Sequence, residues 1–262
     1  MKKGIIIFII LALAGIGLWL ERGSVRFWDG LKPASQTELS EGQLNSEPKA
    51  TSSPVVSIQA KEKAALQARA SIIVSKPISV RAQLADLVKN QAIDKIKQVS
   101  ELIKADYDLD SQWLELAAYR KLIGDYDGAI EAWDFLSLIR PQNYISYNNL
   151  GDLYAFTLKD YDRGEQNFLK SISNNPENVN AYMQLVTIYE ATIQPNKIEP
   201  LLLSGIKSNS ANPTLNILLA RYYAGQKRFN EALAYYEAAA RLDPNNQPLE
   251  DEMIKFIADQ GL

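Results

Sequence analysis

The fold of this chain is decided by a segment that reads GDYDGAIEAW at residues 124–133 and is followed by Pro141. Its order of an aromatic residue, a small residue, a second aromatic residue and a proline returns twice further along. The later copies are Tyr161, Gly164, Phe168 and Pro176, and then Phe229, Ala232, Tyr236 and Pro244. Because 35 residues separate the first two copies and 68 separate the next two, a further copy is expected near residue 195. That copy is degenerate, with Pro195, Ile198 and Leu202 in the corresponding places.

A second set of apolar residues precedes each copy. Spacings of 3, 4 and 7 within each set mark one face of a helix. The chain therefore predicts a helix, a short turn and a second helix in every period. The sets are Trp113, Leu116 and Ala117; Tyr147, Leu150, Gly151 and Tyr154; Tyr182, Leu185, Val186 and Tyr189; and Leu219, Ala220 and Tyr223.

This pattern resembles the tetratricopeptide repeat family, whose units of about 34 residues are helix hairpins. Residues 124–129 and the set Tyr147, Asn149, Leu150, Gly151 and Tyr154 match it closely. The resemblance covers roughly residues 110–246. It implies an all-α fold, namely a right-handed superhelical solenoid of about four helix hairpins with capping helices.

The expected organisation follows the chain from the N-terminus. It consists of an N-terminal tail (1–3), a transmembrane signal-anchor (4–20), a flexible stalk (21–77), a capping helix or degenerate repeat (78–109), repeats at 110–143, 144–178, 179–212 and 213–246, and a C-terminal capping helix (247–262).

Small residues predict where the two helices of a hairpin approach to within about 8 to 10 Å. They are Ala117, Gly151 and Ala220 in first helices, and Ala129, Gly164 and Ala232 in second helices. Pro141, Pro176 and Pro244 are expected to end second helices.

Two of the repeats depart from the pattern. The second has one extra residue near Thr157 or Leu158. The third carries Pro195 and Pro200, and its closing proline is assigned to Pro213. Asn196 and Glu199 are expected to form a cap that starts the second helix of that repeat late, with Pro200 in its first turn.

Residues 4–20 form an uncharged run that follows Lys2 and Lys3, which predicts one membrane span. The alternative is a signal peptide cleaved after the small-x-small pattern at residues 12–14. A short N-terminal tail favours a cytoplasmic N-terminus, so the rest of the chain is expected outside the cytoplasm. Several prolines among polar residues predict the stalk at 21–77, with a weak helical tendency left open at residues 58–74.

Composition excludes several classes of function. The chain has no histidine and no cysteine, so catalytic triads, thiolate metal sites and disulfides are impossible. Its net charge is −3 and it has no basic run, which argues against nucleic acid as a partner. No cofactor, metal or small-molecule substrate is expected. The acidic residues Asp106, Asp108 and Asp110 lack the glycine and the closing glutamate of a calcium loop, so a turn with a helix cap is expected there.

The resemblance also implies a binding surface, because first helices line a concave groove in this family. The groove positions carried over to this chain are mixed in character, and the residues that a carboxylate clamp requires are missing. The site is expected to bind another protein or a peptide. Its candidate residues are Asn148, Asp152, Phe156, Asn180, Met183, Thr187 and Arg221, with Leu114, Lys121 and Glu190 at further groove positions.

The sequence therefore predicts a membrane-tethered scaffold without enzymatic activity, serving the assembly of an envelope, secretion, pilus or cell-wall complex. A self-assembling membrane subunit is one alternative. The other is a hydrolase that uses carboxylate pairs such as Glu131 with Asp134, or Asp160 with Asp162.

Overall fold

The computed structural model describes residues 54–260, and within that range it is all-helical, without a strand. The predicted membrane span at 4–20 and the stalk before residue 54 lie outside the described residues. None of the helices between residues 54 and 260 combines the length and the apolar character needed to cross a bilayer. The described residues from 65 onward form one compact unit, to which the features below belong, except for residues 54–64.

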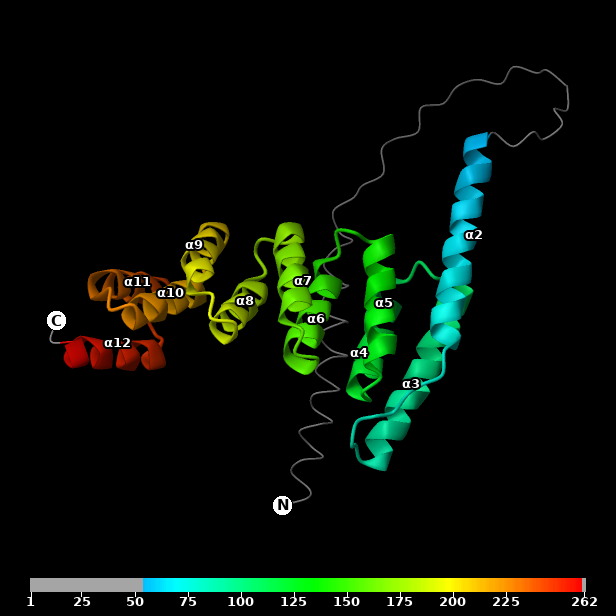
Figure 1. Cartoon of the computed structure of the whole chain (residues 1–262), viewed down its shortest axis with the longest axis horizontal. Coiled ribbons are helices and arrows are strands. Elements are labelled where there is room, and N and C mark those ends of the chain that lie inside the picture. The colour runs from blue at the N-terminus through cyan, green and yellow to red at the C-terminus, as the bar shows by residue number, and fades with distance from the viewer. Residues whose placement is uncertain (1–53, 261–262) are drawn as a thin grey trace, which may run out of the picture. The chain divides into compact units, whose positions relative to one another are not determined.

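The centre of this unit is a succession of four helix pairs. In each pair the two helices lie side by side, and each pair contacts the next along the chain (Figure 1). The pairs are α4 (Asp110–Leu122) with α5 (Tyr126–Ile139), α6 (Tyr144–Asp152) with α7 (Tyr161–Asn174), α8 (Val179–Ala191) with α9 (Ile198–Ser208), and α10 (Pro213–Gly225) with α11 (Phe229–Leu242).

Small residues stand where the paired helices touch, as the sequence predicts. All six of them are buried. A methyl group added to Gly151 would lie 2.9 Å from the ring of Phe168, and one added to Gly164 would lie 2.6 Å from the β-carbon of Ala155. Since carbon atoms pack best at about 3.5 to 4.0 Å, neither position has room for a side chain. The glycines therefore fix the distance between α6 and α7.

The turn inside each pair uses one residue with a left-handed backbone. These residues are Gly124, Lys159, Ile193 and Lys227, with φ values of 79°, 59°, 56° and 59°. Their spacing follows the sequence repeat, so the same left-handed conformation recurs at one position of every turn. In the first two pairs the second helix then begins two residues later behind a capping aspartate, Asp125 or Asp160, which accepts a hydrogen bond from a backbone N–H of the first turn.

The extra residue of the second repeat is absorbed inside the first helix. Residues Leu153–Thr157 form a π-helical turn that continues α6. There the N–H of Leu158 donates to the carbonyl of Leu153 at 3.0 Å, which is the longer bond that defines such a turn. The insertion predicted near Thr157 or Leu158 therefore widens one helical turn and leaves the next turn of the chain in register.

The core is built from aromatic and aliphatic side chains of both helices of each pair. Trp113, Trp133 and Tyr182 are at most 1% exposed, which confirms them as core residues. At the C-terminal end, α12 (Gln247–Gln260) covers the last pair. Its Leu249 is buried, and the ring of its Phe256 lies 5.4 Å from that of Tyr236.

The N-terminal side differs from the expected stalk, which was drawn to residue 77. Residues Pro54–Ser75 form helix α2, and its last part buries Ala70, Ile73 and Val74 in the core. The apolar residues of this stretch are spread around the helix and do not follow one side of it, so its buried face is weak in the sequence. Helix α3 (Asp86–Ala105) follows and packs on α4, within the range expected for a capping helix or degenerate repeat.

The prolines act at both ends of helices. Pro141, Pro176 and Pro244 each lie two residues after the last residue of a second helix, as predicted. The assignment of Pro213 as the closing proline of the third repeat is wrong. Helix α9 ends at Ser208, and Pro213 is the first residue of α10, where a missing N–H costs no helical hydrogen bond.

Candidate functional site

The third helix pair is the irregular one, and its irregularity shapes the candidate site. In the other three pairs the second helix begins two residues after the left-handed residue, whereas α9 begins five residues after Ile193. A 3-10 turn at Pro195–Lys197 fills the interval. Helix α9 has 11 residues, against 14 in α5, α7 and α11. The late start and the place of Pro200 in the first turn of α9 are therefore confirmed.

The expected cap of α9 is absent from these residues. Lys197 precedes the helix, and no side chain caps it. Glu199 instead accepts hydrogen bonds from the hydroxyl of Tyr223 and from Arg228, both at 2.9 Å. Burial, followed by the bond to Glu199, raises the pKa of Tyr223 to about 12, so its hydroxyl stays a donor. The carboxylate was not free to cap its own helix because it joins the third pair to the fourth.

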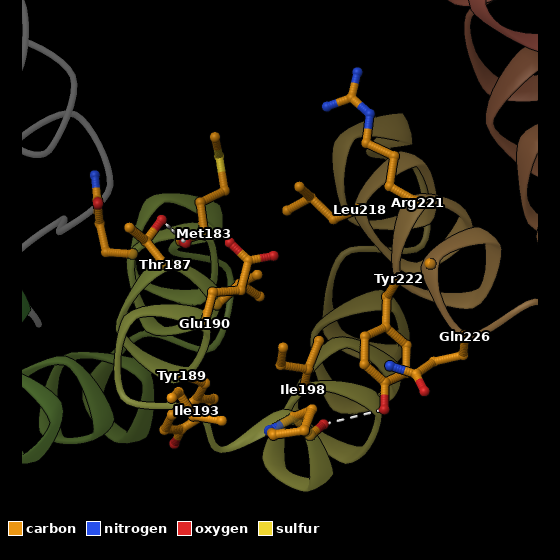
Figure 2. Close-up of a pocket in the computed structure, with 14 residues that line it drawn as sticks. Met183, Thr187, Tyr189, Glu190, Ile193, Ile198, Leu218, Arg221, Tyr222 and Gln226 are labelled. Atoms are coloured by element: carbon orange, nitrogen blue, oxygen red, sulfur yellow. Dashed lines mark hydrogen bonds between the residues drawn. The ribbon is translucent and has the colours of Figure 1, made fainter.

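Between α8 and α10 lies a groove of about 730 Å³, which Figure 2 shows in close-up. Its floor is apolar. Val186 and Ile198 are 7% and 3% exposed, and Leu218 of α10 is half-buried beside them. Met183 and Ile193 stand on the α8 side with exposures of 38% and 85%. Apolar side chains thus continue from the protein interior to the solvent.

Ile193 is the most unusual residue of the groove. A positive φ is unfavourable for every residue with a β-carbon, because that atom crowds the following carbonyl oxygen. It is more unfavourable for a β-branched residue, which carries two further heavy atoms on the β-carbon. The equivalent turns carry Gly124, Lys159 and Lys227, none of which is β-branched. Here an isoleucine is held in the same conformation with almost all of its surface in water. Neither backbone preference nor burial accounts for an isoleucine at this place.

The polar residues of the groove differ in how they are engaged. Arg221 is held by Glu252 of α12 through two hydrogen bonds of 2.7 and 2.6 Å. The hydroxyl of Tyr222 donates to the carbonyl of Pro195 at 3.1 Å and ties α10 to the turn before α9. Glu190 is exposed, and Figure 2 shows its carboxylate directed into the space between α8 and α10. Within residues 54–260 it has no cationic partner.

The structure brings some of the predicted site residues together. Met183, Thr187 and Arg221 line the groove, as does Glu190. Four others lie elsewhere or are engaged. The side chain of Asn148 accepts a hydrogen bond from Asn178 at 3.0 Å, and Asp152 is paired with Lys121 of α4. The ring of Phe156 lies 6.3 Å from that of Phe168. Asn180 is exposed on α8 outside the groove.

Sequence reasoning missed Ile193, Ile198, Leu218 and Tyr222. The first of these had a signal. Residues 124, 159, 193 and 227 share one position of the repeat, and a β-branched residue at the third of them is out of place in a tight turn. The others had none, because they meet only through the late start of α9.

One carboxylate of each pair proposed for hydrolysis, Glu131 and Asp160, has a structural partner. Glu131 is paired with Lys76. Asp160 caps α7 and contacts Arg163 at 2.6 Å, and the N–H and side chain of Arg163 lower the pKa of this carboxyl. In the acidic cluster, Asp106 accepts a hydrogen bond from the N–H of Asp108 at 3.0 Å, which agrees with the predicted turn, whereas the predicted cap is wrong because no side chain caps α4. Asp108 and Asp110 instead hold Arg140 at 2.6 and 3.0 Å.

Comparison with known proteins agrees with the helix pairs. Two family models described as tetratricopeptide repeat match residues 144–178 and 213–246. These are the ranges that the sequence assigns to the second and fourth pairs. The chain therefore contains tetratricopeptide repeats, on the α6/α7 and α10/α11 pairs.

Solved structures of tetratricopeptide repeat proteins are similar in fold. TTC0263, a thermophilic protein of Thermus thermophilus, has 17% identity and a TM-score of 0.46 over 66% of this chain and 96% of its own. MamA has 18% identity and a TM-score of 0.47 over 62% and 97%. YrrB, described as having an unusual peptide-binding site, has 16% identity and a TM-score of 0.47 over 62% and 84%. No curated protein matches the sequence.

Proposed function

We propose that this chain is a membrane-tethered scaffold that binds a partner protein or peptide in the groove between α8 and α10. Tetratricopeptide repeats generally mediate protein–protein or peptide interactions and are typically non-enzymatic, and two of them are present here. The presence of tetratricopeptide repeats supports protein or peptide binding as the function. The groove between α8 and α10 is the proposed binding site on this chain.

The observation that carries the proposal is the exposed apolar surface of the groove. A single exposed aliphatic side chain is common, whereas exposed apolar side chains that are continuous with an apolar recess mark a binding groove. Ile193 is 85% exposed and Met183 is 38% exposed, and both line the groove. Covering these side chains with a partner would remove apolar surface from water, which is the main source of binding free energy at such sites.

The tether is the second part of the proposal and rests on residues 4–20. An uncharged run of this length, with lysines before it and Glu21 and Arg22 after it, suits one span with a cytoplasmic N-terminus. The repeats would then face the extracytoplasmic side and serve an envelope, secretion, pilus or cell-wall complex. Alkaline phosphatase fused after Leu262 should be active in cells. A fusion that is inactive, while a fluorescent protein at the same point matures in the cytoplasm, would reverse the orientation.

Binding is tested by photo-cross-linking in native membranes. A photoreactive amino acid placed at Thr187, exposed in the groove, should give an adduct with another protein. The matched control is Glu237, exposed on α11 outside the groove, which should give little or none. Equal labelling at both positions would contradict the proposal. A homodimer as the main product at Thr187 would favour the self-assembling alternative instead.

A further inference from the structure

We propose that the groove between α8 and α10 selects a peptide segment that carries a large apolar side chain next to a lysine or arginine. The apolar side chain would enter the recess between Ile193 and Leu218, and the cation would pair with Glu190. This inference rests on the proposed function and specifies the chemistry of the partner.

The apolar half of this assignment follows from the floor and the rim together. The floor is made by Val186, Ile198 and Leu218, which belong to the protein core on their inner sides. The rim adds Met183, an unbranched side chain that adapts to different shapes. A volume of about 730 Å³ exceeds what one Phe or Leu side chain fills, so the flanking backbone of a peptide also fits.

Ile193 adds an independent argument. The other three left-handed turn positions are occupied by Gly124, Lys159 and Lys227. A glycine or an unbranched polar residue would satisfy the turn at lower conformational free energy. Strain of this kind persists where it serves contact with something else, and the side chain points away from its own core. Contact with an apolar side chain of a partner would bury the exposed surface of Ile193, which is favourable.

The charged half follows from the two ionised residues at the α8 and α10 walls. Arg221 is neutralised by Glu252, whose two oxygens it contacts at 2.7 and 2.6 Å. Glu190 has no such partner among residues 54–260. The remaining polar lining, such as Gln184 and Gln226, is neutral. The groove therefore presents one uncompensated negative charge beside an apolar recess, and a cationic residue complements it.

Gly225 provides a way to close the groove without touching the core. It lies at the end of α10 and lines the groove, and a β-carbon added there would meet no atom within 4 Å. Gly225→Trp would thus fill the recess from the open side. Glu237→Trp is the matched control, because it adds the same side chain at an exposed position of α11 outside the groove.

The experiment selects a random dodecapeptide display library on the purified full-length chain in detergent micelles. The enriched peptides should contain Phe, Leu, Ile, Met or Trp within three positions of Lys or Arg. Their affinity should fall about tenfold or more for Gly225→Trp and stay unchanged for Glu237→Trp. Glu190→Gln should weaken binding roughly threefold to tenfold, whereas Glu237→Gln on the far helix should not.

Salt separates the two halves of the interaction. As NaCl rises from about 0.1 M to about 1 M, the screening length falls from about 10 Å to about 3 Å. Affinity for the wild-type chain should fall over this range, and affinity for Glu190→Gln should change much less. Ile193→Asn should weaken binding at least about fivefold while the melting temperature stays the same or rises, since asparagine tolerates the left-handed turn. A lower melting temperature would mean that Ile193 supports the fold.

Two other results would overturn the inference. Enriched peptides that are acidic, that lack the apolar–basic pair, or that bind Gly225→Trp as well as wild type would refute this chemistry and leave the proposed function standing. The same holds if no peptide is enriched but Thr187 still cross-links to another protein. Absence of both peptides and hetero-adducts would contradict the proposed function as well.

Discussion

Replacing Gly164 by alanine measures how closely the helices of one pair must approach. The added β-carbon would lie 2.6 Å from the β-carbon of Ala155 and 3.1 Å from its α-carbon. Ordinary contacts between carbon atoms are about 3.5 to 4.0 Å, so α7 and the π-turn would have to separate by about 1 Å. Neither obstructing atom belongs to a flexible side chain, and the backbone cannot move without disturbing the whole pair.

The magnitude follows from two opposing effects. Overpacking a buried position costs about 1 to 3 kcal/mol, and this contact belongs in the upper half of that range. Replacing glycine by alanine inside a helix raises the helical stability by about 1 kcal/mol, which offsets part of this cost. The net loss should be about 1 to 2 kcal/mol of unfolding free energy. For a unit of this size that corresponds to a melting temperature lower by roughly 2 to 8 °C.

The assay compares Gly164→Ala with Gly225→Ala in the purified full-length chain, by denaturant and thermal unfolding followed at 222 nm. Gly225 gains the same methyl group with nothing within 4 Å, so this variant should be more stable than wild type by up to about 1 kcal/mol. Opposite signs for the two variants support the close packing of α7 on the π-turn. If Gly164→Ala is as stable as Gly225→Ala, the approach of α6/η1 and α7 is wrong.

Three further predictions concern stability. Arg120→Met should lower the unfolding free energy by about 3 to 5 kcal/mol in denaturant titration, because Arg120 and Asp125 form a buried ion pair at 2.6 Å and the variant leaves the Asp125 carboxylate buried without its partner. A loss below about 1 kcal/mol would show that water reaches this carboxylate. The hydrogen bond from Arg221 holds the pKa of Glu252 below its ordinary value near 4.5. The stability that this pair provides is therefore present above that value and is lost as the pH falls below it. Between about pH 5 and about pH 3 the melting temperature should drop less in Arg221→Gln than in wild type, and identical profiles would contradict this. Ala232→Leu should lower the melting temperature, since Ala232 is fully buried in the last pair; an unchanged value would mean that the register of the repeat is wrong.

Much of the fold was predictable because it depends on residues that recur. Glycine or alanine at a helix crossing has a steric cause that acts at any position of the chain, so Ala129 and Gly164 could be identified from spacing alone. Proline after a second helix is equally local. The extra residue near Thr157 was also visible. Its outcome as a π-turn was not, because a longer loop would have absorbed it as well.

The buried half of α2 could not be predicted for a different reason. Its buried residues Ala70, Ile73 and Val74 span little more than one helical turn, and the apolar residues on its other sides keep this face from standing out. This face can be recognised only from its contacts in the structure, where it packs in one core with residues of α3 to α5. The right-handed path of the superhelix and the membrane span at 4–20 stay predictions.

The candidate site was predictable only in part. The resemblance to the tetratricopeptide repeat family implied Met183, Thr187 and Arg221 as groove residues, and they do share one groove. That Arg221 is engaged depends on Glu252, which lies 31 residues further on in α12. That Ile193 is exposed depends on how the turn before α9 runs. Contacts of this kind join different repeats, and a pattern within one repeat does not encode them.

We propose that the first helices of the pairs, and α8 and α10 above all, form the binding face. Hydrogen–deuterium exchange of the full-length chain, with and without the protein that cross-links at Thr187, tests it most directly. Binding should slow exchange in Val179–Ala191 and Pro213–Gly225, and should leave Phe229–Leu242 unchanged. Protection centred on α11, or absent from both α8 and α10, would contradict the account.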